Sequence, residues 1–247
     1  MIKIVLLLFL IGHVLADFYL QTTKLALEKD LYFRRLLKHG LIYLLTMIVM
    51  IIPIMSVKLL LWASMIGLVH FAVDFIKFIL KNSFALSSKL ETSVFFIDQA
   101  VHIITIFVAV VCISHFSVPI EYLNWFTNII AYIQTDFENI LSWVLIILTI
   151  ITPSSVVIKK VLFHYKPISD GEDEGHPNAG SLIGILERAI ILLLLSVGQY
   201  SAIGFVLTAK SIARYNKMAD DPAFSEYYLL GTLLSSLLVI IAYLLIF

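Results

Sequence analysis

Residues 59–80 read L-L-L-W-A-S-M-I-G-L-V-H-F-A-V-D-F-I-K-F-I-L, an apolar stretch that carries ionisable side chains at His70, Asp74 and Lys77. A helix of this length rises about 33 Å, which is enough to cross the roughly 30 Å hydrocarbon core of a bilayer. His70 and Asp74 are four residues apart and therefore share one face of the helix. Ionisable groups are costly in lipid and usually face the interior of a helical bundle. The stretch predicts a transmembrane helix whose polar face is directed at other helices.

The whole chain has the composition of an integral membrane protein. Of its 247 residues, 61% are hydrophobic and 14% are charged, and the mean hydropathy is +1.01. A soluble domain carries about 25% charged residues. The apolar runs are continuous rather than alternating, which indicates membrane helices and not a β-barrel. The formal net charge is +0, and nothing in the sequence is typical of a nucleic-acid surface. Cys112 is the sole cysteine, which excludes an intrachain disulfide and a CxxC motif.

The first half of the chain contains four predicted spans. We expect them at residues 2–22, 39–57, 59–80 and 94–116. The polar linkers between them hold an excess of Lys and Arg, and the positive-inside rule places these linkers in the cytoplasm. The first span resembles a cleavable signal peptide. It nevertheless carries His13, Asp17 and Gln21 at helical spacing, which favours a retained membrane helix.

The second half is less regular. Residues 140–158, 181–208 and 227–247 are apolar enough to span, whereas residues 120–136 are either an interfacial helix or a poor span. We favour a crossing at 120–136, because it places Lys210 and Arg214 on the side of the polar groups of the first half. The predicted fold is an all-α polytopic transmembrane helical bundle with six to eight spans. Its predicted parts are a four-helix core at 1–116 and C-terminal helices at 117–247 with an acidic loop at 166–180.

Ionisable residues recur at one depth in the first four spans. The four-residue spacing of His70 and Asp74 is repeated by His13 with Asp17 and, in reverse order, by Asp98 with His102. All these groups fall in the cytoplasmic half of their spans, and a further histidine opens the second span at the same surface. This coincidence predicts one shared site. The predicted metal ligands are His13, Asp17, His39, His70, Asp74, Asp98 and His102.

The residue types of this set suit a divalent metal ion. Imidazole nitrogens and carboxylate oxygens bind zinc or manganese, and also iron, and helical bundles build such sites from facing helices. Seven ligands exceed the needs of one tetrahedral ion. They fit two bridged ions, or one ion with carboxylates that orient the histidines. Such a site activates water for phosphoester hydrolysis, with Asp98 as the expected general base and Lys77 as a catalytic cation that also binds the anionic head group.

Other polar residues in apolar segments are candidates for substrate binding. Glu187, Lys210 and Arg214 complete the predicted substrate-binding set together with Lys77. Lys210 and Arg214 share a helix face and could bind lipid phosphate, although basic residues at a helix end more often anchor it to the interface. The sequence contains no P-loop, dinucleotide fingerprint, GxSxG or HExxH motif.

Several segments resemble a known protein family. The segments I-G-H-V-L-A-D-F-Y-L-Q-T (11–22), H-F-A-V-D (70–74) and D-Q-A-V-H (98–102) resemble the bacterial multi-pass proteins of domain-of-unknown-function family 3307. The resemblance covers about the first 120 residues, and segments such as G-I-L-E-R (184–188) are similar to longer members. It implies a multi-pass protein of the bacterial inner membrane and no particular activity. The HxxxD pairs are also similar in style to membrane-bound metal-dependent hydrolases of the LexA-binding type.

The expected function is a metal-dependent membrane hydrolase that acts at the cytoplasmic leaflet. Its expected substrate is a phosphoester or ester of a lipid or other amphiphile, and no nucleic-acid partner is expected. A proton- or ion-coupled carrier is the first alternative, since carriers also line their paths with Asp and His. The second is a non-catalytic membrane scaffold, because His–Asp pairs also form plain interhelical hydrogen bonds. The oligomeric state, the metal and the substrate are left open.

Overall fold

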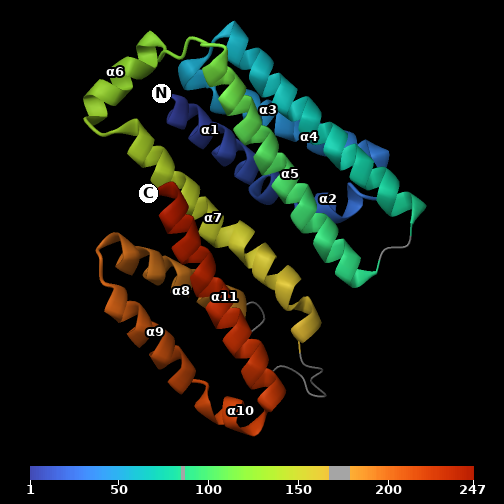
Figure 1. The fold of residues 1–247 in the computed structure, drawn as a ribbon, viewed down its shortest axis with the longest axis vertical. Coiled ribbons are helices and arrows are strands. Elements are labelled where there is room, and N and C mark those ends of the chain that lie inside the picture. The colour runs from blue at the N-terminus through green and yellow to red at the C-terminus, as the bar shows by residue number, and fades with distance from the viewer. Residues whose placement is uncertain (85–86, 167–178) are drawn as a thin grey trace. The chain divides into compact units, whose positions relative to one another are not determined.

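The computed structural model describes residues 1–84, 87–166 and 179–247, and the regular elements in these ranges are all helical (Figure 1). The predicted all-α fold is confirmed. The elements are α1 (Ile2–Val14), a π-helical turn (Leu15–Tyr19), α2 (Thr23–Glu28), α3 (Phe33–Met50), a 3₁₀ turn (Ile52–Ile54), α4 (Val57–Ser83), α5 (Ser88–His115), α6 (Asn124–Ile133), α7 (Phe137–Leu162), a 3₁₀ turn (Phe163–Tyr165), α8 (Ala179–Ser196), α9 (Tyr200–Ile212), α10 (Tyr215–Asp220) and α11 (Pro222–Ile246). The acidic tract of the predicted loop 166–180 lies outside the described residues.

Six helical segments of the described ranges are long and apolar enough to cross a membrane. They are Ile2–Tyr19, Val57–Ser83, Ser88–His115, Phe137–Tyr165, Ala179–Ser196 and Pro222–Ile246. This number agrees with the predicted six to eight spans, and the chain is a membrane protein. The helix α3 is not in this set, because its first turns carry Arg34, Arg35 and Lys38 as well as its apolar residues.

Several predicted boundaries differ from the structure. The second predicted span, 39–57, begins earlier, at Phe33, and its α-helix ends at Met50 before a 3₁₀ turn that contains Pro53. The apolar segment 181–208 is two helices, α8 and α9, because the chain turns at Gly198 with a φ of +71°, a conformation that glycine adopts without steric cost. The last helix begins at Pro222, where proline is favoured in the first turn.

The segment 120–136 does not cross the membrane. Its helix α6 has 10 residues, which at 1.5 Å each rise about 15 Å, half the thickness of the hydrocarbon core. The favoured crossing was therefore wrong. The crossing was the reason for placing Lys210 and Arg214 on the same side of the membrane as the polar groups of the first half, and that reason no longer holds.

The chain divides into two compact units, Met1–Leu145 and Ile146–Phe247. The first unit extends past the predicted boundary at residue 116 because the following segment packs back on it. The backbone N–H of Leu123 donates to the carbonyl of Pro53 (3.0 Å), and Phe137 packs edge-on against Phe126 with ring centroids 4.8 Å apart. Lys3 forms an ion pair with Glu138 (3.0 Å).

Four long helices of the first unit form a closed ring. In this ring α1 packs against α3 and α5, and α4 packs against α3 and α5 (Figure 1). Helices α3 and α4 approach closely at Gly67, where an added Cβ would lie 2.8 Å from Leu44 Cδ1 and 3.3 Å from its Cα. The short α2 and the turn after it follow α1 at one end of the ring. Lys29 lies in this turn, and its side chain is buried in the interior of the ring.

Candidate metal centre

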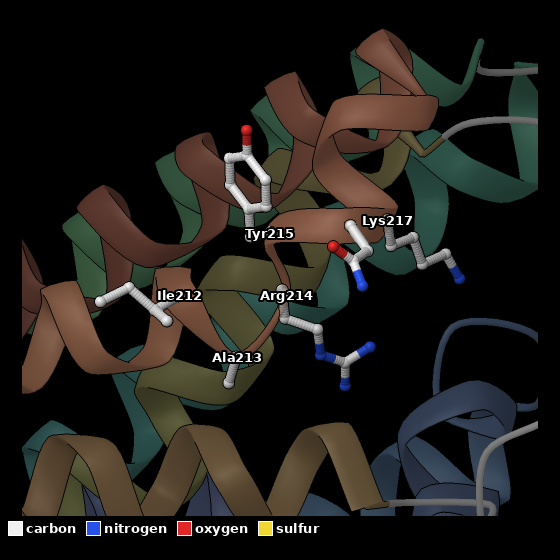
Figure 2. Close-up of a pocket in the computed structure, with 6 residues that line it drawn as sticks. Ile212, Ala213, Arg214, Tyr215 and Lys217 are labelled. Atoms are coloured by element: carbon white, nitrogen blue, oxygen red, sulfur yellow. The ribbon is translucent and has the colours of Figure 1, made fainter.

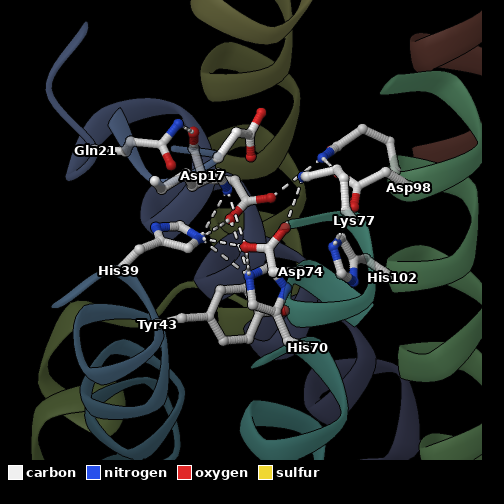
Figure 3. Close-up of polar contacts among 12 residues, drawn as sticks. Asp17, Gln21, His39, Tyr43, His70, Asp74, Lys77, Asp98 and His102 are labelled. Atoms are coloured by element: carbon white, nitrogen blue, oxygen red, sulfur yellow. Dashed lines mark hydrogen bonds and ion pairs between the residues drawn. The ribbon is translucent and has the colours of Figure 1, made fainter. Parts of the chain in front are cut away.

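The seven predicted ligands converge inside the four-helix ring of the first unit (Figure 3). Each of them is buried, with a relative exposure of 7% or less. The imidazole rings lie close together, with centroids of His70 and His102 4.0 Å apart and those of His13 and His102 5.8 Å apart. The i,i+4 pairs read from the sequence therefore face one another in space, as their helical spacing predicts.

Four ligand atoms form a compact set at the centre. His39 Nε2 lies 3.1 Å from His70 Nε2, 3.3 Å from Asp17 Oδ1 and 3.2 Å from Asp74 Oδ2. His70 Nε2 lies 3.5 Å from each of the same two carboxylate oxygens. We call these atoms the four-atom set. It is contributed by two helices, α3 and α4, and by the π-helical turn that carries Asp17, a type of turn that recurs at functional sites.

Two buried lysines border the four-atom set. Lys29 Nζ donates to Asp74 Oδ2 (3.0 Å) and lies 3.1 Å from His39 Nε2. Lys77 Nζ bridges two carboxylates, at 2.7 Å from Asp74 Oδ1 and 3.0 Å from Asp98 Oδ2. With neutral imidazoles, the three aspartates and two lysines leave one net negative charge in the cluster.

The fourth helix of the ring, α5, adds a carboxylate–imidazole pair. Asp98 Oδ1 lies 3.4 Å from His102 Nε2, and both residues belong with Asp74 to a group whose ligand atoms lie within 4.8 Å of one another. Gln99 donates to Asp17 Oδ2 (3.2 Å), so α5 also holds the aspartate of the first helix. By contrast, Gln21 donates to the backbone carbonyl of Asp17 and not to its carboxylate.

Tyr43 fixes two of the histidines. Its ring stacks on His70 with centroids 3.5 Å apart and an interplanar angle of 11°, and its hydroxyl lies 3.2 Å from His13 Nδ1. The tyrosine is four residues after His39 on α3, so the two side chains share the face that lines the cluster. Tyr43 therefore orients the rings of His13 and His70, and His70 contributes one atom of the four-atom set.

Several buried polar atoms of the cluster have no hydrogen-bond partner among the described residues. They include His13 Nε2, Asp17 Oδ1, Asp98 Oδ1 and both ring nitrogens of His102. Buried polar atoms are normally satisfied, and an exception calls for an explanation such as a catalytic role or a bound ion.

Three predicted substrate-binding residues lie in the second unit. Glu187 and Lys210 form an ion pair with a 2.5 Å contact, and Lys210 Nζ also donates to Thr232 (3.0 Å). Arg214 lines a cavity of about 410 Å³ at the turn from α9 to α10, together with Tyr215 and Lys217 (Figure 2). Among the described residues, no hydrogen bond or ion pair joins Arg214 to Glu187 or Lys210.

Sequence reasoning missed Lys29, Tyr43 and Gln99. Lys29 was read with the other basic residues of its linker as a topology signal, and nothing in its neighbours marks it as buried. Tyr43 had a usable signal, the four-residue spacing from His39. Gln99 adjoins Asp98, but only the arrangement of α1 and α5 shows that it reaches Asp17.

Comparison with known proteins gives one match. The model of a family described as "Protein of unknown function (DUF3307)" matches residues 5–129, just over half of the chain and all of the residues in the cluster. Neither the curated proteins nor the solved structures contain a match to this sequence. The similarity of the second half to longer members lies beyond the matched residues and stays a prediction. The chain belongs to the DUF3307 family.

Proposed function

We propose that the chain is a metal-dependent hydrolase of the bacterial inner membrane that cleaves a phosphoester of a lipid or other amphiphile at the cytoplasmic leaflet. The observation that carries the proposal is the four-atom set. A tetrahedral ion with bonds of about 2.0–2.1 Å holds its ligand atoms about 3.3–3.5 Å apart. Five of the six distances within the set run from 3.1 to 3.5 Å.

The charges favour one ion. Without Lys29, whose ammonium group contacts two atoms of the four-atom set, the three aspartates and Lys77 carry two net negative charges. One divalent ion would then make the buried site neutral, as burial in low dielectric demands. A second divalent ion would instead bring two net positive charges, which argues for one ion with the remaining residues around it.

The remaining groups supply the other needs of hydrolysis. Zinc can expand from four to five ligands during a reaction, which would admit water or a phosphoryl oxygen. His102 has two unpartnered ring nitrogens and a carboxylate at 3.4 Å, so we assign it the role of general base and Asp98 the role of orienting it. Asp98, which the sequence led us to expect as the general base, would then act through His102. Lys77 would contact the anionic group from its place between Asp74 and Asp98.

The first test is the metal content of the purified full-length protein. We expect about one zinc or manganese ion per chain in the wild type and less than about 0.3 in His70→Ala, since a site with a missing ligand loses most of its affinity. His115→Ala is the matched control, because His115 is exposed at the end of α5. Equal metal content in all three proteins would refute the centre.

The second test is turnover of labelled phospholipids and polyprenyl phosphates by the metal-loaded protein. His102→Ala should keep its metal and lose about 10²–10⁴-fold in rate, the usual contribution of a general base. A metal-loaded wild type that releases no product from any of these lipids would refute the hydrolase.

A carrier is the second candidate, and one observation favours it. His70 lies at the middle of α4 (Val57–Ser83), and secondary carriers bind their cargo near the bilayer midplane. In that case the metal would be cargo and not a cofactor. Zinc uptake into liposomes that contain the protein, without turnover of any lipid, would support the carrier over the hydrolase.

A further inference from the structure

The ammonium group of Lys29 contacts two atoms of the four-atom set. It lies 3.0 Å from Asp74 Oδ2 and 3.1 Å from His39 Nε2, and the residue is only 6% exposed. Unlike the other cluster residues it comes from the turn that follows α2 and not from a long helix. In the sequence it is one of several basic residues of a polar linker, and the proposed reaction does not use it.

We propose that Lys29 is an internal competitor that sets which cations the centre binds and how tightly. The proposal rests on the proposed metal centre. An imidazole nitrogen that accepts a hydrogen bond does so with its one lone pair, which is the pair that a metal ion needs. When Lys29 donates to His39 Nε2, that nitrogen cannot be a ligand. Lys29 must therefore leave the four-atom set before an ion can occupy it.

The positive charge of Lys29 also weakens the binding of a metal ion. An ammonium group within contact distance of two ligands repels a divalent ion that enters between them, and in a buried site this repulsion is poorly screened. A cation must bind its ligands strongly enough to overcome both effects. Zinc binds mixed nitrogen and oxygen sites strongly, whereas magnesium gives up its water reluctantly. Lys29 would thus admit zinc and exclude magnesium.

Outside the cluster, the turn that carries Lys29 is held by side-chain contacts at the surface, which are two ion pairs and a hydrogen bond from Asn82 to the carbonyl of Asp30 (3.0 Å). Glu28 pairs with Arg35 (2.8 Å) and Asp30 pairs with Lys81, and all four side chains are partly exposed. Ion pairs at such positions contribute about 0–1 kcal/mol. The turn can therefore move away from the cluster without disturbing the four long helices, and Lys29 becomes accessible when it does.

The test is the zinc and magnesium affinity of the full chain in detergent, measured by competition with a chromophoric chelator. Lys29→Gln should bind zinc at least about tenfold more tightly than the wild type, because it removes at least one charged hydrogen bond that competes with the ion. It should also gain measurable magnesium binding. Lys29→Arg, which keeps the charge, should stay within about threefold of the wild type. Lys24→Gln is the control for charge alone, since Lys24 is exposed in the same segment and pairs with Glu28.

A second measurement follows Lys29 directly. Zinc loading of the wild type should increase labelling of Lys29 by a water-soluble amine reagent, read by mass spectrometry, while Lys77 stays protected. If Lys29→Gln binds zinc no more tightly than the wild type, or labelling is unchanged, the role of Lys29 is refuted and the metal centre stands. If neither protein binds zinc, the metal centre and the role of Lys29 fail together.

Discussion

Removing one partner of the ion pair between Lys77 and Asp98 should destabilise the first unit far more than removing one partner of an exposed pair. Lys77 Nζ contacts Asp74 and Asp98, and the side chains of all three residues are at most 11% exposed. Removing one partner of a buried pair costs about 3–5 kcal/mol, because the other charge is left without compensation. Lys77→Met should therefore lower the unfolding temperature of a chain of this size by roughly 6–20 °C, at about 2–4 °C per kcal/mol.

The double variant separates this effect from a loss of packing. Lys77→Met with Asp98→Asn removes one positive and one negative charge, and Asp74 keeps Lys29 as its partner. Replacing both members of a buried pair is often close to neutral. The double variant should therefore melt closer to the wild type than either single variant does, with a coupling free energy of about 2–3 kcal/mol.

The assay is thermal unfolding in detergent, followed by circular dichroism with a chelator present so that bound metal makes no contribution. Lys24→Met is the matched control, because Lys24 is 73% exposed and lies 3.7 Å from Glu28; such a pair is worth at most about 1 kcal/mol. The reasoning is refuted if Lys77→Met melts within 2 °C of Lys24→Met, a difference of less than about 1 kcal/mol. It is also refuted if the effects of the two single substitutions simply add in the double variant.

Three further predictions concern packing, the second unit and the metal. Gly67→Ala should destabilise the first unit by about 1–3 kcal/mol, since the added Cβ would meet Leu44. Gly180→Ala is the control, because nothing lies within 4 Å of its added Cβ, and it should change the unfolding temperature by less than the error of the measurement. Arg188→Met should lower the stability of the second unit by about 3 kcal/mol, because the guanidinium group donates to backbone carbonyls of α7 and to serine hydroxyls of α7 and α11. Thermal unfolding of the second unit is followed by proteolysis of α7, and a change below about 1 kcal/mol would contradict the prediction. Removal of zinc by a chelator should lower the melting temperature of the wild type and leave that of His70→Ala unchanged, because an ion that binds the folded state adds about 2.7 kcal/mol at a concentration of 100 times its Kd.

The sequence predicted the helical part of the candidate site well, for a simple physical reason. The pairs at 13 and 17, 70 and 74, and 98 and 102 have the spacing of one helical turn, and polar groups in an apolar helix are directed at its neighbours. Convergence then required only that the helices pack side by side. The face of α3 with His39 and Tyr43 follows the same rule.

What the sequence did not predict depends on chain reversals. The burial of Lys29 requires the turn after α2 to fold back into the ring, and its linker is otherwise as basic as any cytoplasmic loop. The break between α8 and α9 depends on the positive φ of Gly198, whereas the composition of 181–208 is that of one continuous helix. The short α6 was ambiguous because aromatic and polar residues alternate in both interfacial and spanning segments.

The bond from Gln99 to Asp17 joins residues 82 positions apart in the chain. At a synthesis rate of about 5–20 residues per second, α1 leaves the ribosome roughly 4–16 s before the helix that completes its surroundings. During that interval Asp17 lacks the hydrogen bond from Gln99, although His39 and His70, which also contact its carboxylate, are made earlier. A nascent chain that stops before residue 99 should therefore be a preferred target of membrane quality-control proteases.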